Sequence, residues 1–261
     1  MQRVTSRQNP RLLEAARLIA SSRDRRKAGK CVLEGEHLIG VYLERMAAPE
    51  YLLVVEERLA DARIAALIAR MPSQDVIAVS GALFAEIATV PADVGVLAVV
   101  PTPRPAVPPP ARFHLLLEDL QDPGNVGTIL RTAAAAGVEQ VLLSKHCAFA
   151  WSPKVLRAGQ GAHFLTTVVE DVDLAAWVAS FRARGGLVGA MVAHHGADLY
   201  ATALPRPLAI AVGNEGSGLS APLAASADTR ITIPMPGGME SLNAAAAAAV
   251  VLFETVRRGP N

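Results

Sequence analysis

Leu208-Ala-Ile-Ala-Val-Gly-Asn-Glu-Gly-Ser-Gly-Leu219 passes from a continuous apolar run to a loop with three glycines in six positions. The apolar run predicts a buried strand of a parallel sheet. Glycine lets a backbone come close to a ligand, so the loop fits the wall of a small-molecule site. Asn214 and Glu215 place polar side chains beside that backbone. Ordinary turn chemistry also explains the glycines, so this stretch alone leaves both interpretations open.

A second strand and loop follow in the same third of the chain. Thr229–Ile233 predicts a strand, and a Pro/Gly turn comes after it. Ser241 or Asn243 is placed to cap the alanine-rich helix expected over Ala244–Glu254. Carboxyl ends of neighbouring parallel strands meet at one edge, where ligands of α/β proteins bind. We expect backbone groups there to hold a flat heterocycle. The apolar side chains expected against it are Ile233, Met235 and Leu242.

The third informative stretch is Asp122-Pro-Gly-Asn-Val-Gly-Thr-Ile-Leu-Arg131. It begins in the polar turn expected after a strand at Phe113–Leu117 and runs into a helix expected over Thr128–Ala136. Arg131 falls on the first turns of that helix, where a cation opposes the helix dipole. Such a position favours function, because an arginine beside helix amides can hold a phosphate or ribose oxygen.

Length and order indicate two domains. A chain of 261 residues is long enough for two modest domains. Pro101–Pro110 holds six prolines in ten positions, which excludes helix and central strand and predicts a linker. We therefore expect a small α/β domain over 1–100 and a second domain over 111–261. Strands alternate with helices in the second, which predicts a mostly parallel sheet covered on both faces.

Composition narrows the classes further. Apolar residues make up 51% and charged residues 19%, as in a globular chain. No apolar run is long enough for a membrane span, and no signal peptide is visible at the N-terminus. Cys31 and Cys147 lack zinc or disulfide-framework spacing, and the histidines form no metal-ligand pattern. We expect a cytoplasmic protein without a metal.

Positive charge is concentrated at the N-terminus. Residues 1–30 hold nine Arg and Lys against two acids, a local net charge of +7 in a chain of net charge +1. A basic segment favours a polyanionic partner, most simply nucleic acid, although a charge run alone is more often a solvated face. The residues predicted to contact such a polyanion are Arg3, Arg7, Arg11, Arg25, Arg26 and Lys27.

Taken together, the three stretches resemble the SpoU branch of the SPOUT superfamily, the knotted RNA 2′-O-ribose methyltransferases. The matching motifs, in the family's order, are Asn125-x-Gly-x-x-x-Arg131, Gly213-Asn-Glu-Gly-x-Gly218 and Ile233-Pro-Met with Glu240-Ser-Leu-Asn243. Thr5-Ser-Arg-Gln-Asn-Pro-Arg and Leu33-Glu-Gly-Glu-His resemble the substrate-binding domain ahead of many members, which is similar to a small ribosomal-protein fold. The chain departs from the family at Ala244–Ala246, where Val-Ser-Val is frequent, and at Gly159, where serine is common.

The resemblance implies S-adenosylmethionine as methyl donor, a deep trefoil knot in the C-terminal domain, and a homodimer whose site draws on both subunits. The residues it implies for cofactor binding are Val212, Gly213, Asn214, Gly218, Ile233, Met235 and Leu242. Those it implies for catalysis and positioning are Asn125, Arg131, Glu215, Ser241 and Asn243. Arg131 has been cast as the base in the family, but a guanidinium is effectively always protonated, so we expect a phosphate clamp or alkoxide stabiliser.

Rival functions remain at this point. A catalytically silent RNA-binding protein with this fold would be expected to lack Asn125, Arg131 or Ser241–Asn243, all of which are present. A nicotinamide-type α/β enzyme is disfavoured because no G-x-G-x-x-G follows the first strand of the second domain. Ribosomal RNA is expected over transfer RNA because a separate recognition domain precedes the catalytic one, an argument by fold analogy.

Overall fold

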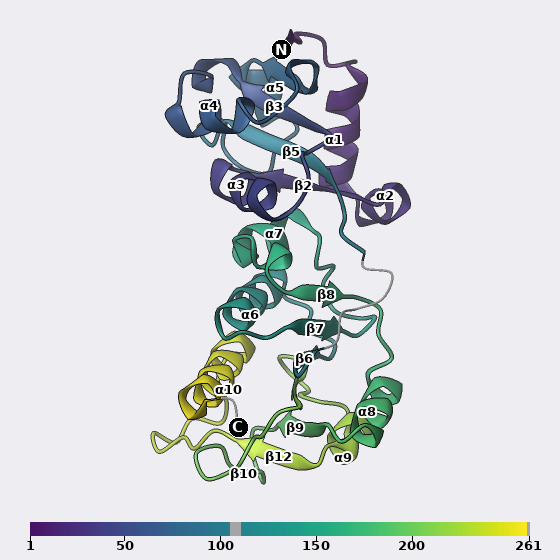
Figure 1. Ribbon diagram of the computed structural model, residues 1–261, viewed down its shortest axis with the longest axis vertical. Coiled ribbons are helices and arrows are strands. Elements are labelled where there is room, and N and C mark those ends of the chain that lie inside the picture. Colours follow the sequence, from purple (N-terminus) through teal and green to yellow (C-terminus); the bar gives the residue numbers. More distant parts are fainter. Residues whose placement is uncertain (105–110, 260–261) are drawn as a thin grey trace. The chain divides into compact units, whose positions relative to one another are not determined.

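The computed structural model describes residues 1–104 and 111–259. The chain forms two compact units, each described by itself below (Figure 1). The first consists of Met1–Arg104 together with Trp151–Phe164, and the second holds the remainder. Of the linker expected over 101–110, Pro101 ends a strand, and residues 105–110 lie outside the described residues.

The first unit is a five-stranded mixed sheet between helices. Its strands are β1 (Gln2–Arg3), β2 (Lys30–Glu34), β3 (Tyr51–Val55), β4 (Val76–Val79) and β5 (Val96–Pro101), in the order β1-β4-β3-β5-β2. Its helices are α1 (Pro10–Ala20), α2 (Ser22–Ala28), α3 (Glu36–Arg45), α4 (Ala62–Ile68), α5 (Gly81–Ala85) and α7 (Pro153–Gly159), with short 3₁₀ turns at Glu56–Arg58, Ser73–Asp75 and Ala162–Phe164. Leu12 and Leu18 of α1 and Phe84 of α5 are buried on one face of the sheet.

The placement of Trp151–Phe164 differs from the expected division at residue 111. Arg157 on α7 donates to the buried Glu34 of β2 at 2.5 Å. The ring of Phe164 packs edge-on against Tyr42 of α3, with centroids 5.1 Å apart. In sequence, Trp151–Phe164 lies between β7 and β8 of the second sheet. Its contacts with β2 and α3 nevertheless place it in the first unit.

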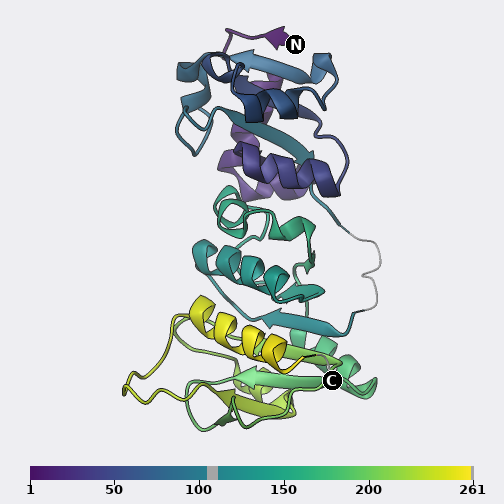
Figure 2. The same cartoon turned by 60° about the vertical axis from the view of Figure 1, so that its left-hand side comes forward.

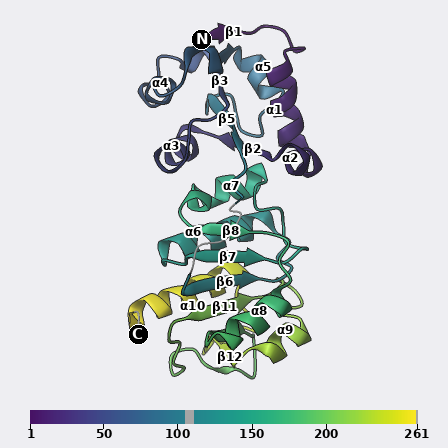
Figure 3. The same cartoon turned by 45° about the vertical axis from the view of Figure 1, so that its right-hand side comes forward.

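The second unit is a parallel seven-stranded sheet in the order β10-β12-β9-β11-β6-β7-β8. Its strands are β6 (Phe113–Leu117), β7 (Gln140–Leu143), β8 (Thr167–Val169), β9 (Leu187–Met191), β10 (Ala197–Asp198), β11 (Leu208–Val212) and β12 (Thr229–Thr232). Its helices are α6 (Pro123–Ala135), α8 (Leu174–Ala183), α9 (Ala221–Ser226) and α10 (Ala244–Arg258). Helices α6 and α10 lie side by side on one face, and α8 and α9 on the other (Figures 1 and 3). The sheet is therefore parallel and covered on both faces, as expected.

Helix α6 starts five residues before the predicted Thr128. Asp122 caps it by accepting from the amide of Asn125 at 2.8 Å, and Pro123 stands at the first helical position, where its missing N–H is not needed. Asn125 and Gly127 are therefore helical, and not part of a turn. Helix α10 begins as predicted after Asn243, whose side chain accepts from the amides of Ala245 and Ala246.

Two short helices, α2 and α9, were not predicted from the sequence, because charged or alanine-rich runs of six or seven residues show no clear periodicity. Among the residues that the structure describes, no helix has both the length and the apolarity to cross a membrane.

Candidate functional site

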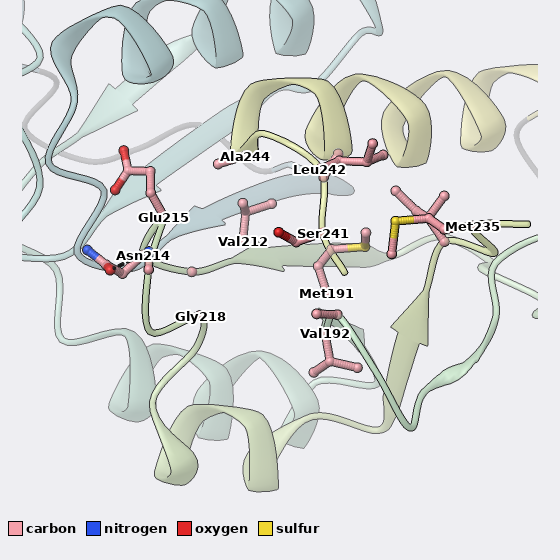
Figure 4. A pocket seen from close by; sticks show the side chains of 15 residues that line it. Met191, Val192, Val212, Asn214, Glu215, Gly218, Met235, Ser241, Leu242 and Ala244 are labelled. Atoms are coloured by element: carbon pink, nitrogen blue, oxygen red, sulfur yellow. Dashed lines mark hydrogen bonds between the residues drawn. The ribbon is translucent and has the colours of Figure 1, made fainter. Parts of the chain in front are cut away.

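A pocket lies at the carboxyl ends of β9, β11 and β12, beside the start of α10. Figure 4 shows Asn214 and Glu215 at one end and Met235 at the other, with Val212 and Ser241 between them. The pocket is lined by Met191, Val192, Ala193, Val212, Gly213, Asn214, Glu215, Gly216, Gly218, Ile233, Met235, Ser241, Leu242, Ala244 and Ala247. All seven residues predicted to bind the cofactor are in this set. The two loops singled out in the sequence therefore form one cavity.

Only glycine fits at position 213, because the loop that follows folds back closely on it. The amide of Asn214 donates to the carbonyl of Gly218 at 3.0 Å, and the reverse bond is 2.9 Å long. A Cβ on Gly213 would lie 2.2 Å from the carbonyl carbon of Gly218 and 2.2 Å from the nitrogen of Leu219. Such a Cβ would strike the loop's own backbone before it could meet a ligand.

The 213–220 loop is held on both sides by the end of β6. Asn214 donates its side-chain amide to the carbonyl of Asp119 at 2.8 Å, while its oxygen accepts from the amide of Gly216 at 2.9 Å. Glu118 accepts from both the amide and the hydroxyl of Ser220 at 2.7 Å. These bonds fix the shape of the loop before any ligand arrives.

A chain of hydrogen bonds joins the three motifs. Asn243 donates through Nδ2 to Oδ1 of Asn125 at 3.0 Å, and Asn125 donates through Nδ2 to Glu215 at 3.2 Å. Glu215 also accepts from the amides of Gln121 and Asp122. Residues far apart in the sequence thus form one hydrogen-bond network, which includes three of the residues predicted for catalysis and positioning: Asn125, Glu215 and Asn243.

Glu215 is held in its charged form. Partial burial would raise its pKa, but hydrogen bonds from its own amide, from Asn125 and from the amides of Asp122 and Gln121 outweigh that effect, and the pKa lies below the ordinary value. A carboxylate that accepts this many bonds is a weak base, which fits a structural part in the network.

Arg131 and Ser241 are placed differently. Ser241 is exposed and lines the pocket. Arg131 is exposed on α6, does not line the pocket, and makes no hydrogen bond or ion pair within the described residues. Its guanidinium is thus available to a group from outside this chain.

Comparisons with known proteins agree with this geometry. Residues 112–253 match the SpoU rRNA Methylase family. The chain belongs to this family. It is 36% identical to an uncharacterized tRNA/rRNA methyltransferase of Synechocystis over 98% of this chain and 93% of that one. It is 32% identical to the 23S rRNA (guanosine(2553)-2′-O)-methyltransferase of Bacillus subtilis, over 97% and 98%.

Solved structures match over nearly the whole chain. The SpoU methyltransferase AviRb of Streptomyces viridochromogenes, in complex with the cofactor AdoMet (S-adenosylmethionine), superposes with a TM-score of 0.84 at 28% identity, covering 96% of this chain and 98% of that one. Residues 9–98 match the MRM3-like substrate binding domain. The similarity to this SpoU methyltransferase structure therefore extends to both halves of the chain.

The basic residues predicted to bind RNA are not equally available in this SpoU-family chain. Arg25 is only 5% exposed, and its guanidinium donates to the carbonyls of Leu18 and Ile19 at the end of α1. It stabilises a helix end and does not face solvent, so we remove it from the set. Its burial follows from the tight α1–α2 corner, which the sequence did not predict.

The other five differ in their partners. Arg3 pairs with Glu56, Arg7 with Glu86 and Arg11 with Asp75. Arg26 and Lys27 are exposed on α2.

Sequence reasoning missed the pocket wall at Met191, Val192 and Ala193. Met191 ends β9, which carries no polar motif, and Val192 and Ala193 follow it. They reach the pocket because β9 lies between β11 and β12. Only the strand order reveals that. Among the described residues, no group of three His, Cys, Asp or Glu gathers as metal ligands do.

Proposed function

We propose that this chain transfers a methyl group from S-adenosylmethionine to a ribose 2′-oxygen of RNA, with ribosomal RNA as the substrate class. The observation that carries the proposal is that the second and third motifs line one pocket, and that a hydrogen-bond network joins the first motif to both, in a chain of the SpoU family. The Bacillus subtilis relative is named as a 23S rRNA 2′-O-methyltransferase, which supports the substrate class and a cytoplasmic setting.

The pocket fits the cofactor. Its wall combines a preformed backbone loop, Gly213–Gly218, with the apolar side chains of Ile233, Met235 and Leu242. Backbone amides and carbonyls can hydrogen-bond a heterocycle's edge while apolar side chains cover its faces. When bound there, the cofactor supplies the electrophilic methyl group.

The remaining task of the protein is to place the 2′-hydroxyl and assist loss of its proton. Arg131 suits a contact with the ribose-phosphate, where its planar guanidinium can donate two parallel bonds and stabilise a developing alkoxide. It would do so without accepting the proton, which leaves to a phosphate oxygen or water. Asn125, Glu215 and Asn243 hold the start of α6 and the cofactor loop in register.

We also propose a homodimer formed through the second unit. Helix α10, the yellow helix of Figure 2, packs on α6 with one face. Its other face leaves Phe253 48% and Val256 43% exposed, and Leu242 just before the helix is 41% exposed. A second copy is a suitable cover for this apolar stripe. Because Arg131 does not line the pocket of its own chain, the dimer would also bring it to the partner's cofactor.

The trefoil knot and the ribosomal-protein-like character of the first unit belong to the same proposal, supported by the whole-length similarity to SpoU structures. For RNA binding, Lys27 becomes the foremost candidate of the N-terminal set, because it is exposed and makes no hydrogen bond or ion pair within the described residues. Arg3, Arg7 and Arg11 would have to exchange a carboxylate for a phosphate.

Two measurements test the proposed function. Isothermal titration should show binding of S-adenosylmethionine in preference to NAD and ATP. Mapping of 2′-O-methyl groups in total RNA, with and without the gene, should reveal a site in ribosomal RNA that depends on this chain. A dependent site in transfer RNA would change the substrate class, and binding of RNA without any dependent site would support a catalytically silent protein.

A further inference from the structure

The turn after β7 presents two basic side chains that the mechanism does not use. Lys145 and His146 are exposed, and neither makes a hydrogen bond or ion pair within the described residues. Arg3, Arg7 and Arg11 of the first unit, in contrast, already pair with carboxylates. Side chains that are exposed and unpaired can bind a polyanion without first losing a partner.

The turn is rigidly attached to the segment after β6. The amide of Asp119 donates to Oγ of Ser144 at 2.9 Å, and that hydroxyl donates to the carboxylate of Asp119 at 2.5 Å. The amide of Cys147 closes the turn on the carbonyl of Ser144, and the amide of Ala148 donates to Leu120 at 2.7 Å. Positions 145 and 146 are therefore fixed relative to the start of α6, so binding there costs little ordering of the backbone.

Strand register places this turn level with the cofactor pocket. Val212, which lines the pocket, is the Cα partner of Leu117 in β6, and Leu117 is the partner of Leu143 in β7. Two strand spacings, about 10 Å, separate the strand ends. A polynucleotide whose target ribose lies at the pocket can thus pass over β6 and reach the turn with a neighbouring nucleotide.

We infer that the Lys145–His146 turn binds the RNA backbone beside the target nucleotide. Lys145 pairs with a phosphate, and His146 donates to a phosphate or sugar oxygen of the same strand. The contact reads no base, so it fixes the register of the RNA on the enzyme without adding sequence specificity. This inference rests on the proposed function and adds to it the side of the pocket on which the flanking strand runs.

The test uses the full chain and a transcript of bacterial 23S ribosomal RNA. The double variant Lys145→Gln/His146→Gln should bind the transcript about tenfold more weakly, and the slope of log affinity against log salt should fall by about 0.7 per lost phosphate contact. Lys145→Arg should keep most of the affinity. S-adenosylmethionine affinity should stay at the wild-type value in both, which shows that the pocket is intact. Arg230→Gln removes an exposed charge from β12 as a matched control and should change nothing.

Three results separate the possible failures. Wild-type affinity and salt slope in the double variant would overturn the inference while leaving the proposed function in place. Equal losses in Lys145→Arg and the double variant would overturn it as well, because charge would then not be the cause. A wild-type chain that neither binds the transcript nor methylates ribosomal RNA would instead remove the proposed function.

Discussion

Arg131 is the residue on which the proposed chemistry depends. It lies on α6, in a segment separate from the cofactor loops, and has no partner within the described chain. Arg131→Ala should leave cofactor affinity nearly unchanged and slow methyl transfer at least a hundredfold, about 2.7 kcal/mol at ~1.36 kcal/mol per decade. Arg131→Lys should rescue little, because a point charge cannot replace two parallel donors. The rate of transfer is measured in a single turnover, with labelled methyl, RNA and saturating cofactor. If Arg131→Ala transfers methyl at the wild-type rate, Arg131 has a structural role and not a catalytic one.

Gly213 offers a second prediction at the same scale. Since a Cβ there would lie 2.2 Å from backbone atoms of Gly218 and Leu219, Gly213→Val must open the loop. We expect calorimetry to show loss of S-adenosylmethionine binding. Gly216→Ala in the same loop is the matched control, because its Cβ would meet only the side-chain oxygen of Asn214, at 3.6 Å. It should bind within a few-fold of wild type, and equal losses in both variants would show that the close approach at Gly213 is not the cause.

Among the elements, α10 is anchored at its far end by a charge cluster. Arg257 and Arg258 both hydrogen-bond Glu254 and lower its pKa to about 2. Arg258 also donates to the carbonyls of Leu199 and Thr202, so the cluster ties α10 to the chain after β10. A carboxylate whose folded pKa is depressed stabilises the fold above its unfolded pKa and loses that effect as the pH falls.

We expect the stability difference between the wild type and Glu254→Gln to depend on pH. The free energy of unfolding of the wild type should fall between about pH 4.5, the ordinary value, and pH 2. Glu254→Gln should be less stable at neutral pH and show a shallower fall over that window. Glu240→Gln, in the exposed loop before α10, should keep the wild-type slope. Denaturant titrations at several pH values measure it, and parallel curves for wild type and Glu254→Gln would exclude the cluster as the source.

The elements also show what sequence reasoning can reach. Strands β6 and β11 lie where their apolar runs predicted, because burial on both faces leaves a local signature. The start of α6 was placed too late, since glycines at 124 and 127 concealed a cap at Asp122. Strand order is a non-local property, so the wall at Met191–Ala193 could not be predicted. The glycine loops and Asn125 were found because their chemistry is local, whereas their hydrogen-bond network was not visible.

At the scale of the whole molecule, the segment Trp151–Phe164 alters what a truncation should do. A domain boundary at residue 111 predicts that residues 111–261 fold, dimerise and bind cofactor alone while methylating RNA poorly. The structure places 151–164 in the first unit, where Arg157 neutralises the buried Glu34 and a Cβ on Gly161 would lie 2.8 Å from Val41. Removing residues 1–104 therefore strips this segment of its partners while leaving the pocket's strands and loops complete.

Hydrogen exchange should show separately whether the segment 151–164 loses its protection and whether the strands that carry the pocket stay folded. In the 111–261 fragment, amides of 151–164 should exchange much faster than in the full chain, while those of β6 and β11 stay protected and S-adenosylmethionine still binds.

Arg157→Ala in the full chain should give an intermediate exchange rate for 151–164. It leaves the Glu34 carboxylate with Thr89 as its remaining partner and costs roughly 3 kcal/mol of folding stability. Arg3→Ala, which breaks the exposed pair with Glu56, should cost under about 1 kcal/mol and leave 151–164 unchanged. Full protection of 151–164 in the fragment would show that this segment folds with the second unit, and would restore the boundary expected from the sequence.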